Sequence, residues 1–305
     1  MQRRWQLASS LAVSAALLPG GAVHAQLGAS APGDSRGDGL VTVSLLCGSN
    51  PIGPGQTFHL GVRFDIMPKW HMYWKNPGAG ALPPRIVVTA PAGYTVGDVL
   101  WPRPVAITTP LGPEYGYYDA VVLFVPITAP ATLTDGTVSL HAFIQWTVCR
   151  EVCRMGSARR EVVTATSSRA GATAPTVRPG GPLAALWKRL PAALSGLTAA
   201  GSSFDGTTLS LTGPAGGMTS AAFFPVDAPG ITYGTADITI RQSRFRVTVP
   251  VELKPANAAG EPMALAGLVT LGEKPDDPCY DFMIPLTVEP PDPPDPTRKA
   301  DAPRD

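Results

Sequence analysis

The chain has 305 residues, a formal net charge of +1 and 15% charged residues. A charge so close to zero provides no bulk attraction to nucleic acid or to an anionic membrane surface, so we expect no nucleic-acid partner. The 34 Pro and 32 Gly disfavour long helices and favour many short strands joined by turns.

The first 25 residues have the features of an export signal. Arg3 and Arg4 precede an apolar run over residues 7–18, and Val23-His24-Ala25 offers the small residues of a signal-peptidase site. We therefore expect residues 1–25 to be a signal peptide that is cleaved near Ala25. Removing both arginines from the 24 basic residues leaves 22 against 23 acidic ones, a formal charge of −1. The apolar run is shorter than the roughly 20 residues of a membrane span, and no later segment is long enough, so we expect no direct span.

Residues 26–39 are small, polar and Gly-rich, and we expect a flexible lead-in. A first domain is predicted at residues 40–166, where aromatic and β-branched runs alternate with turn signals such as Asn50-Pro51 and Asp135-Gly136. The predicted strands span residues 41–46, 57–64, 85–89, 120–125, 138–146 and 160–164. Six or more short strands at this spacing are typical of an all-β, immunoglobulin-like antiparallel sandwich.

Residues 167–181 shift to Ala, Thr, Pro and Gly and predict a linker. Residues 182–288 predict a second, smaller β-rich domain with one short helix at 183–194. The apolar face of that helix would carry Leu183, Leu186, Trp187 and Leu190. The strands predicted in this domain span residues 208–211, 220–224, 238–240, 245–249, 264–269 and 282–288. Residues 289–305 are rich in Pro and charge and cannot bury a core, so we expect a disordered tail.

All four cysteines, Cys47, Cys149, Cys153 and Cys279, follow the predicted signal peptide. An even count in an oxidising compartment indicates pairing, and four cysteines allow three connectivities. Cys149 and Cys153 are the first candidate pair because only three residues separate them. Cys47 and Cys279 can then pair with each other or stay free, and the sequence does not choose between these outcomes.

A bond between Cys149 and Cys153 requires the chain to fold back. Four positions along a strand cover about 13 Å, whereas a disulfide needs Cα atoms roughly 4.4 to 6.8 Å apart. A hairpin with the connection Arg150-Glu151-Val152 or a single helical turn would satisfy this distance. The aromatic and β-branched content of residues 141–148 favours the hairpin.

Several segments occur in an order that points to a known family. They are Pro54-Gly55-Gln56, Trp70-His71-Met72-Tyr73-Trp74-Lys75-Asn76-Pro77-Gly78, Trp101-Pro102-Arg103-Pro104, Tyr115-Gly116-Tyr117, and Trp146-Thr147-Val148-Cys149 with Cys153. With them, residues 41–164 resemble the periplasmic N-terminal domain of the DsbD-type thiol:disulfide interchange proteins, above all the version in suppressor-of-copper-sensitivity proteins. The three-residue cysteine spacing departs from the wider loop of the best-known members.

The resemblance implies a periplasmic oxidoreductase of the protein-disulfide reductase type, with Cys149 and Cys153 as the redox pair and no cofactor. In that family the second cysteine forms the mixed disulfide, which points to Cys153. The resemblance also implies a role in cytochrome c biogenesis or copper stress. Full-length members continue into a membrane electron conduit and a thioredoxin-like domain, and this sequence has neither. We therefore expect thioredoxin-like periplasmic oxidoreductases as partners and a separately encoded membrane conduit.

The resemblance further implies a cap over the cysteines. In the family an aromatic loop shields them until a partner docks; Tyr115 matches the capping tyrosine, and Glu114 stands where the family often has a phenylalanine. The alternative is an ordinary Gly-containing turn with exposed tyrosines. For Trp70 to Gly80, with its lone His71, we favour core packing followed by a tight Asn-Pro-Gly corner over a metal site.

Two other functions compete with redox exchange. The first is a non-catalytic interaction module with a structural disulfide that staples the hairpin. A loop this short adds little stability through chain entropy, and Arg150 and Arg154 beside the pair would favour the reactive thiolate, so both points favour exchange. The second is copper binding by soft ligands. The candidate copper ligands are Cys149, Cys153, Met155 and His141.

Overall fold

The computed structural model describes most of the chain after the lead-in. The described residues are 35–36, 39–80, 82–110, 112–169, 182–197, 200–254 and 263–286. The predicted signal peptide and tail lie outside them, as do most of the predicted lead-in and linker. Nearly all regular structure is β-sheet, which confirms the predicted all-β class. No helix among the described residues is both long and apolar enough to cross a membrane.

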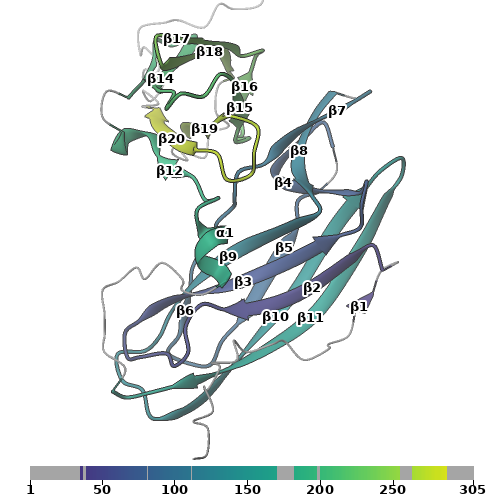
Figure 1. The fold of residues 1–305 in the computed structure, drawn as a ribbon, viewed down its shortest axis with the longest axis vertical. Helices are drawn as coiled ribbons and strands as arrows, with labels where there is room; N and C mark the ends of the chain where they lie inside the picture. The colour runs from purple at the N-terminus through teal and green to yellow at the C-terminus, as the bar shows by residue number, and fades with distance from the viewer. Residues whose placement is uncertain are drawn as a thin grey trace, which may run out of the picture.

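Two antiparallel sheets form a sandwich in the first half of the chain (Figure 1). The larger sheet contains β1 (Ser35–Arg36), β4 (His71–Gly78), β5 (Arg85–Thr89), β7 (Val105–Thr109), β8 (Gly112–Tyr118), β10 (Gly136–Cys149) and β11 (Cys153–Thr166). The facing sheet contains β2 (Val41–Cys47), β3 (Thr57–Ile66), β6 (Thr95–Val96) and β9 (Ala120–Thr128). This is the predicted immunoglobulin-like sandwich.

The core of the sandwich follows from side-chain alternation. Along β10, Val138, Leu140 and Ile144 are buried and belong to one cluster with Leu60 and Phe64 of the facing sheet. Ala142 belongs to the same cluster. The intervening Ser139, His141 and Phe143 point to the outer face of the larger sheet, because successive side chains of a strand alternate. Full burial of each such aliphatic side chain contributes about 1.5–3 kcal/mol.

Four strands of the larger sheet were not predicted, namely β1, β4, β7 and β8, and β1 lies within the predicted lead-in. In strand order, β10 pairs with β4, β4 with β8, and β8 with β7. The Asn-Pro-Gly segment at residues 76–78 is not the predicted corner. It lies in β4, within an irregularity where the pairing with β8 shifts between Tyr73 and Gly78. Pro and Gly residues in β4 and β8 signal turns locally, and pairing with neighbouring strands overrides that signal.

The predicted helix is shorter than expected. It spans α1 (Pro182–Trp187) and is followed by β12 (Ala192–Ala193) and a 3₁₀ turn, η1 (Leu194–Gly196). Pro191 has no amide hydrogen and disfavours helix up to residue 194. The four residues predicted on one face do pack together, against Val122 and Phe124 of β9.

A second set of sheets follows, which we name the C-terminal β unit (residues 192–286). Its other strands are β13 (Gly201–Phe204), β14 (Thr208–Pro214), β15 (Ala221–Pro225), β16 (Ile231–Tyr233), β17 (Asp237–Arg241), β18 (Arg244–Leu253), β19 (Met263–Leu271) and β20 (Cys279–Leu286). They enclose a core of their own that includes Leu211, Val247 and Leu265. The unit lies at one end of the sandwich, near β4 and β8 (Figure 1). The exact domain boundaries stay a prediction.

The hairpin of β10 and β11 offers a test of this packing. Gly156 lies opposite Trp146, and a Cβ at Gly156 would overlap the indole ring. We expect Gly156→Ala to lower the free energy of unfolding by about 1–3 kcal/mol, because the buried ring must shift. Denaturant unfolding measures this change. Gly136→Ala in the same hairpin meets no close atom and serves as the control; equal effects of the two substitutions would contradict the packing argument.

Candidate redox site

The two cysteines close the tip of the β10–β11 hairpin. Cys149 ends β10, Cys153 begins β11, and the two residues pair directly in register. Their sulfurs form a disulfide, with the Cα atoms 4.1 Å apart. The amide of Arg150 donates to the carbonyl of Val152 at 3.2 Å across the loop. The predicted hairpin and the predicted bond are both present, and the helical-turn alternative is excluded.

The disulfide belongs to a row of side chains across four strands. Cys149 pairs with Cys153 on one edge of β10 and with His71 of β4 on the other edge. His71 in turn pairs with Tyr118 of β8. Directly paired residues of an antiparallel sheet point to the same face, with Cβ atoms about 4.5–5.5 Å apart. His71 is therefore the side chain beside Cys149 on the side away from Cys153.

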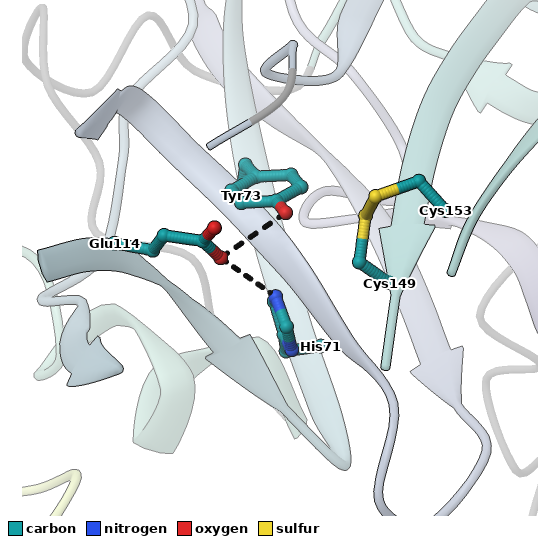
Figure 2. Close-up of a disulfide and its surroundings, with 5 residues drawn as sticks. All are labelled: His71, Tyr73, Glu114, Cys149 and Cys153. Carbon is teal, nitrogen blue, oxygen red and sulfur yellow. Dashed lines mark hydrogen bonds and ion pairs between the residues drawn. A yellow bond between two sulfur atoms is a disulfide. The ribbon is translucent and has the colours of Figure 1, made fainter. Parts of the chain in front are cut away.

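A buried hydrogen-bond network adjoins this row (Figure 2). Oε2 of Glu114 lies 3.1 Å from Nε2 of His71 and accepts a hydrogen bond from the hydroxyl of Tyr73, also at 3.1 Å. The exposed fractions are only 6% for Glu114, 5% for His71 and 1% for Tyr73. Gly80 covers the network, since a Cβ there would collide with Tyr73 and Glu114. A buried carboxylate requires such partners, because an unpaired one would be strongly destabilising.

Sequence reasoning assigned no functional role to His71 or Tyr73. The sequence favours core packing for both residues, and for His71 it favours packing over a metal site. The available signal was their two-residue spacing, which places both side chains on one face of a strand. Without knowledge that this segment pairs with the cysteine strand, that spacing did not connect them to the disulfide.

The two cysteines differ in accessibility. Cys149 is only 3% exposed, whereas Cys153 is an exposed residue at the start of β11. Val152 and Met155, which flank Cys153, are exposed as well. An incoming thiolate must approach a sulfur directly, and Cys153 is the residue of the pair open to that approach.

Tyr115 does not cover the pair as predicted. Glu114 lies on the disulfide side of β8, so its neighbour Tyr115 points to the opposite side. The Tyr115 ring packs edge-on against Phe224, with centroids 5.2 Å apart. Burial, and then the charge of Asp227, raises the pKa of the Tyr115 hydroxyl. Glu114 is a buried hydrogen-bond acceptor for His71 and Tyr73 and does not form a lid over Cys153.

Arg150 and Arg154 are not both placed beside the disulfide as expected. The Arg150 guanidinium stacks on the Trp70 ring at 5.4 Å and lies 3.9 Å from Glu151. Arg154 is paired with Val148, in the row that faces away from the disulfide side of the sheet. The geometry therefore does not place both arginines where they would stabilise a thiolate of the pair.

The four predicted copper ligands do not come together. His141 precedes Cys149 by eight residues on the same strand, which is roughly 26 Å. Met155 lies closer, opposite Thr147 in the row next to the disulfide. In the part of the chain that the structure describes, no three His, Cys, Asp or Glu residues form a group able to hold a metal ion.

Cys47 and Cys279 are both free and buried. The Cys47 thiol donates to the carbonyl of Ser49 at 3.2 Å, and the Cys279 thiol approaches the carbonyl of Arg189 at 3.7 Å. Burial raises the pKa of Cys47, and it raises the pKa of Cys279 to about 12. Each thiol therefore stays protonated at neutral pH and is a poor nucleophile.

Comparison with known proteins agrees with this geometry. Residues 48–165 match the family model described as the N-terminal part of the thiol:disulfide interchange protein DsbD. This part, less than half of the chain, is similar to the N-terminal domain of that thiol:disulfide interchange family. No curated protein sequence matches the chain.

Among solved structures, the chain is similar to the N-terminal periplasmic domain of ScsB from Proteus mirabilis. The TM-score is 0.53 at 20% identity, over 81% of this chain and 94% of that one. At this identity the likeness concerns the fold. Because it covers more of the chain than the sandwich, it includes residues of the C-terminal β unit.

The cysteine states can be tested by thiol counting. We expect the oxidised native protein to show no fast-reacting thiol at pH 8, because Cys47 and Cys279 are buried and protonated. Denaturant should release both thiols, and prior reduction should add Cys149 and Cys153. Labelling with iodoacetamide followed by non-reducing peptide mapping measures this pattern. A peptide that links Cys47 to Cys149 would contradict the assignment.

Proposed function

We propose that this chain is a periplasmic thiol:disulfide interchange protein that exchanges two electrons with thioredoxin-like oxidoreductases through Cys149 and Cys153. The observation that carries the proposal is the unequal exposure of the pair: Cys153 is open and Cys149 is buried beside a titratable network. The matching family and the periplasmic origin of the similar ScsB domain support both the activity and the compartment.

The exchange proceeds in two displacements. A thiolate of the reduced partner attacks the sulfur of Cys153; the bond to Cys149 breaks, and Cys149 leaves as a thiolate that takes up a proton. The second thiolate of the partner then attacks the partner's own sulfur in the mixed disulfide and releases Cys153. The partner is oxidised by two electrons, and the pair is reduced by two.

The network beside Cys149 suits the first displacement. The leaving sulfur forms in a buried position, where a negative charge is costly unless it is neutralised. His71 occupies the adjacent cross-strand position and is tied to Glu114 and, through it, to Tyr73. We assign His71 as the group that supplies the proton at Cys149, with Glu114 and Tyr73 as positioning residues.

The wider pathway is proposed from the resemblance. Reducing power would come from a separately encoded membrane conduit, and the exchange would serve cytochrome c biogenesis or the response to copper stress. The sequence resemblance to the version in suppressor-of-copper-sensitivity proteins favours the copper-stress branch. A structural disulfide is the competing interpretation; a reduction potential below about −300 mV would favour it, whereas the exposure of Cys153 favours exchange.

Single-cysteine variants test which sulfur is attacked. In Cys149→Ser the exposed Cys153 remains, and in Cys153→Ser the buried Cys149 remains. We expect Cys149→Ser to react roughly tenfold faster or more with a thioredoxin whose nucleophilic cysteine carries thionitrobenzoate, because the exposed thiol is the accessible nucleophile. Absorbance of the released dye gives the rate, and a non-reducing gel identifies the complex. Equal or reversed rates would contradict the assignment of Cys153.

The network has a test of its own in Glu114→Gln. The amide keeps the shape of the side chain but removes the carboxylate that holds His71. We expect the rate of exchange with reduced thioredoxin to fall about tenfold, less than the roughly 10²–10⁴ of a complete general acid, because water can also deliver the proton. Stopped-flow fluorescence measures the rate. Glu161→Gln is the control, since Glu161 also faces a histidine, His141, but far from the pair; an unchanged rate in Glu114→Gln would remove the network from the mechanism.

A further inference from the structure

The two strands that carry the network, β4 and β8, have packed side chains on both faces. On β4, His71 and Tyr73 point to the disulfide side, whereas Trp74 belongs to the buried cluster on the other side. On β8, Glu114 and Tyr115 divide in the same way. Whatever packs on Trp74 and Tyr115 therefore lies directly behind the network.

Phe224 of the C-terminal β unit occupies that place. Its ring packs edge-on against Trp74, with centroids 6.2 Å apart, and against Tyr115, at 5.2 Å. Phe224 is buried and belongs to the cluster of the first sandwich, although its own strand, β15, is part of the second. The two β units are thus joined through an aromatic contact on the two strands that position the network.

Polar contacts hold the same junction. The Asn76 amide donates to the carbonyl of Pro225 at 2.8 Å and to Asp227 at 3.1 Å, while its oxygen accepts from the amide of Gly78 at 2.8 Å. These bonds hold the irregular part of β4 against the C-terminal β unit. A second anchor is the buried Arg103, which donates to the carbonyls of Leu271, Gly272 and Asp277 at 3.0 Å each.

We propose that the C-terminal β unit positions the redox site, with Phe224 as the positioning residue that acts through Trp74 and Tyr115 on Tyr73 and Glu114. The inference rests on the proposed function for its effect on exchange. Close-packed interiors transmit the loss of a buried ring to the groups around it, since the neighbours relax only partly into the space. On a strand, a shift of Tyr115 moves the adjacent Glu114.

Adjacent phenylalanines supply a matched pair of variants in the full chain. Phe224→Ala removes the ring behind the network. Phe223→Ala removes a ring that points the other way, onto Tyr233 and Phe282 in the core of the C-terminal β unit. We expect Phe224→Ala to change the rate of exchange with reduced thioredoxin by roughly 2- to 30-fold, the range of couplings through packed residues, and to shift the NMR signals of the His71 ring. Phe223→Ala should leave both unchanged while it lowers the thermal midpoint.

A separate readout keeps the inference independent of the partner. Reduction of the pair by dithiothreitol needs no docking, so its rate and the His71 signals report on positioning even if no thioredoxin-like partner exchanges with the protein. Failure of exchange alone would sink the proposed function and leave these readouts standing. If Phe224→Ala does not fold, Phe224→Leu, which retains part of the packing, takes its place. Wild-type dithiothreitol rates and His71 signals in the folded variant would overturn the positioning role.

Discussion

The register of β10 with its two neighbours is the constraint on which the site depends. Because Cys149 pairs with Cys153 on one edge and with His71 on the other, the disulfide and the titratable network share one face of one sheet. A slip of one residue between β10 and β4 would turn His71 and Tyr73 to the opposite face. Met72 and Trp74, on the core face of β4, oppose such a slip because it would remove them from the buried cluster.

Burial of the network of Glu114, His71 and Tyr73 costs folding free energy. A carboxylate at 6% exposure loses most of its hydration, and Tyr73 and His71 replace water as its partners. Folding alone would be served as well by apolar residues at these three positions. Polar groups kept in a buried place beside a disulfide therefore favour a chemical role over a purely structural one.

Strands and turns could be predicted from the sequence where the local residue patterns agree with the fold. The spacing of Cys149 and Cys153 implied a hairpin, and the predicted strand at residues 85–89 has the bounds of β5. The sequence was insufficient for β4 and β8, whose Asn, Pro and Gly residues signal turns but are held in strands by their neighbours. That failure carried over to the site: once β8 was taken for a loop, the alternation that separates Tyr115 from Glu114 was lost.

Residues in the segments that carry the family resemblance lie on two different faces of the larger sheet. Within Trp70 to Gly78, His71 and Tyr73 face the disulfide, while Trp74 and Asn76 contact the C-terminal β unit. Arg103 of the Trp-Pro-Arg-Pro segment binds that unit as well. A short motif can meet both demands because a strand presents alternate residues to opposite sides. The proposed redox site and the attachment of the second β unit therefore depend on the same few residues. A backbone shift that alters the side chains on one face of the strand also moves those on the other face.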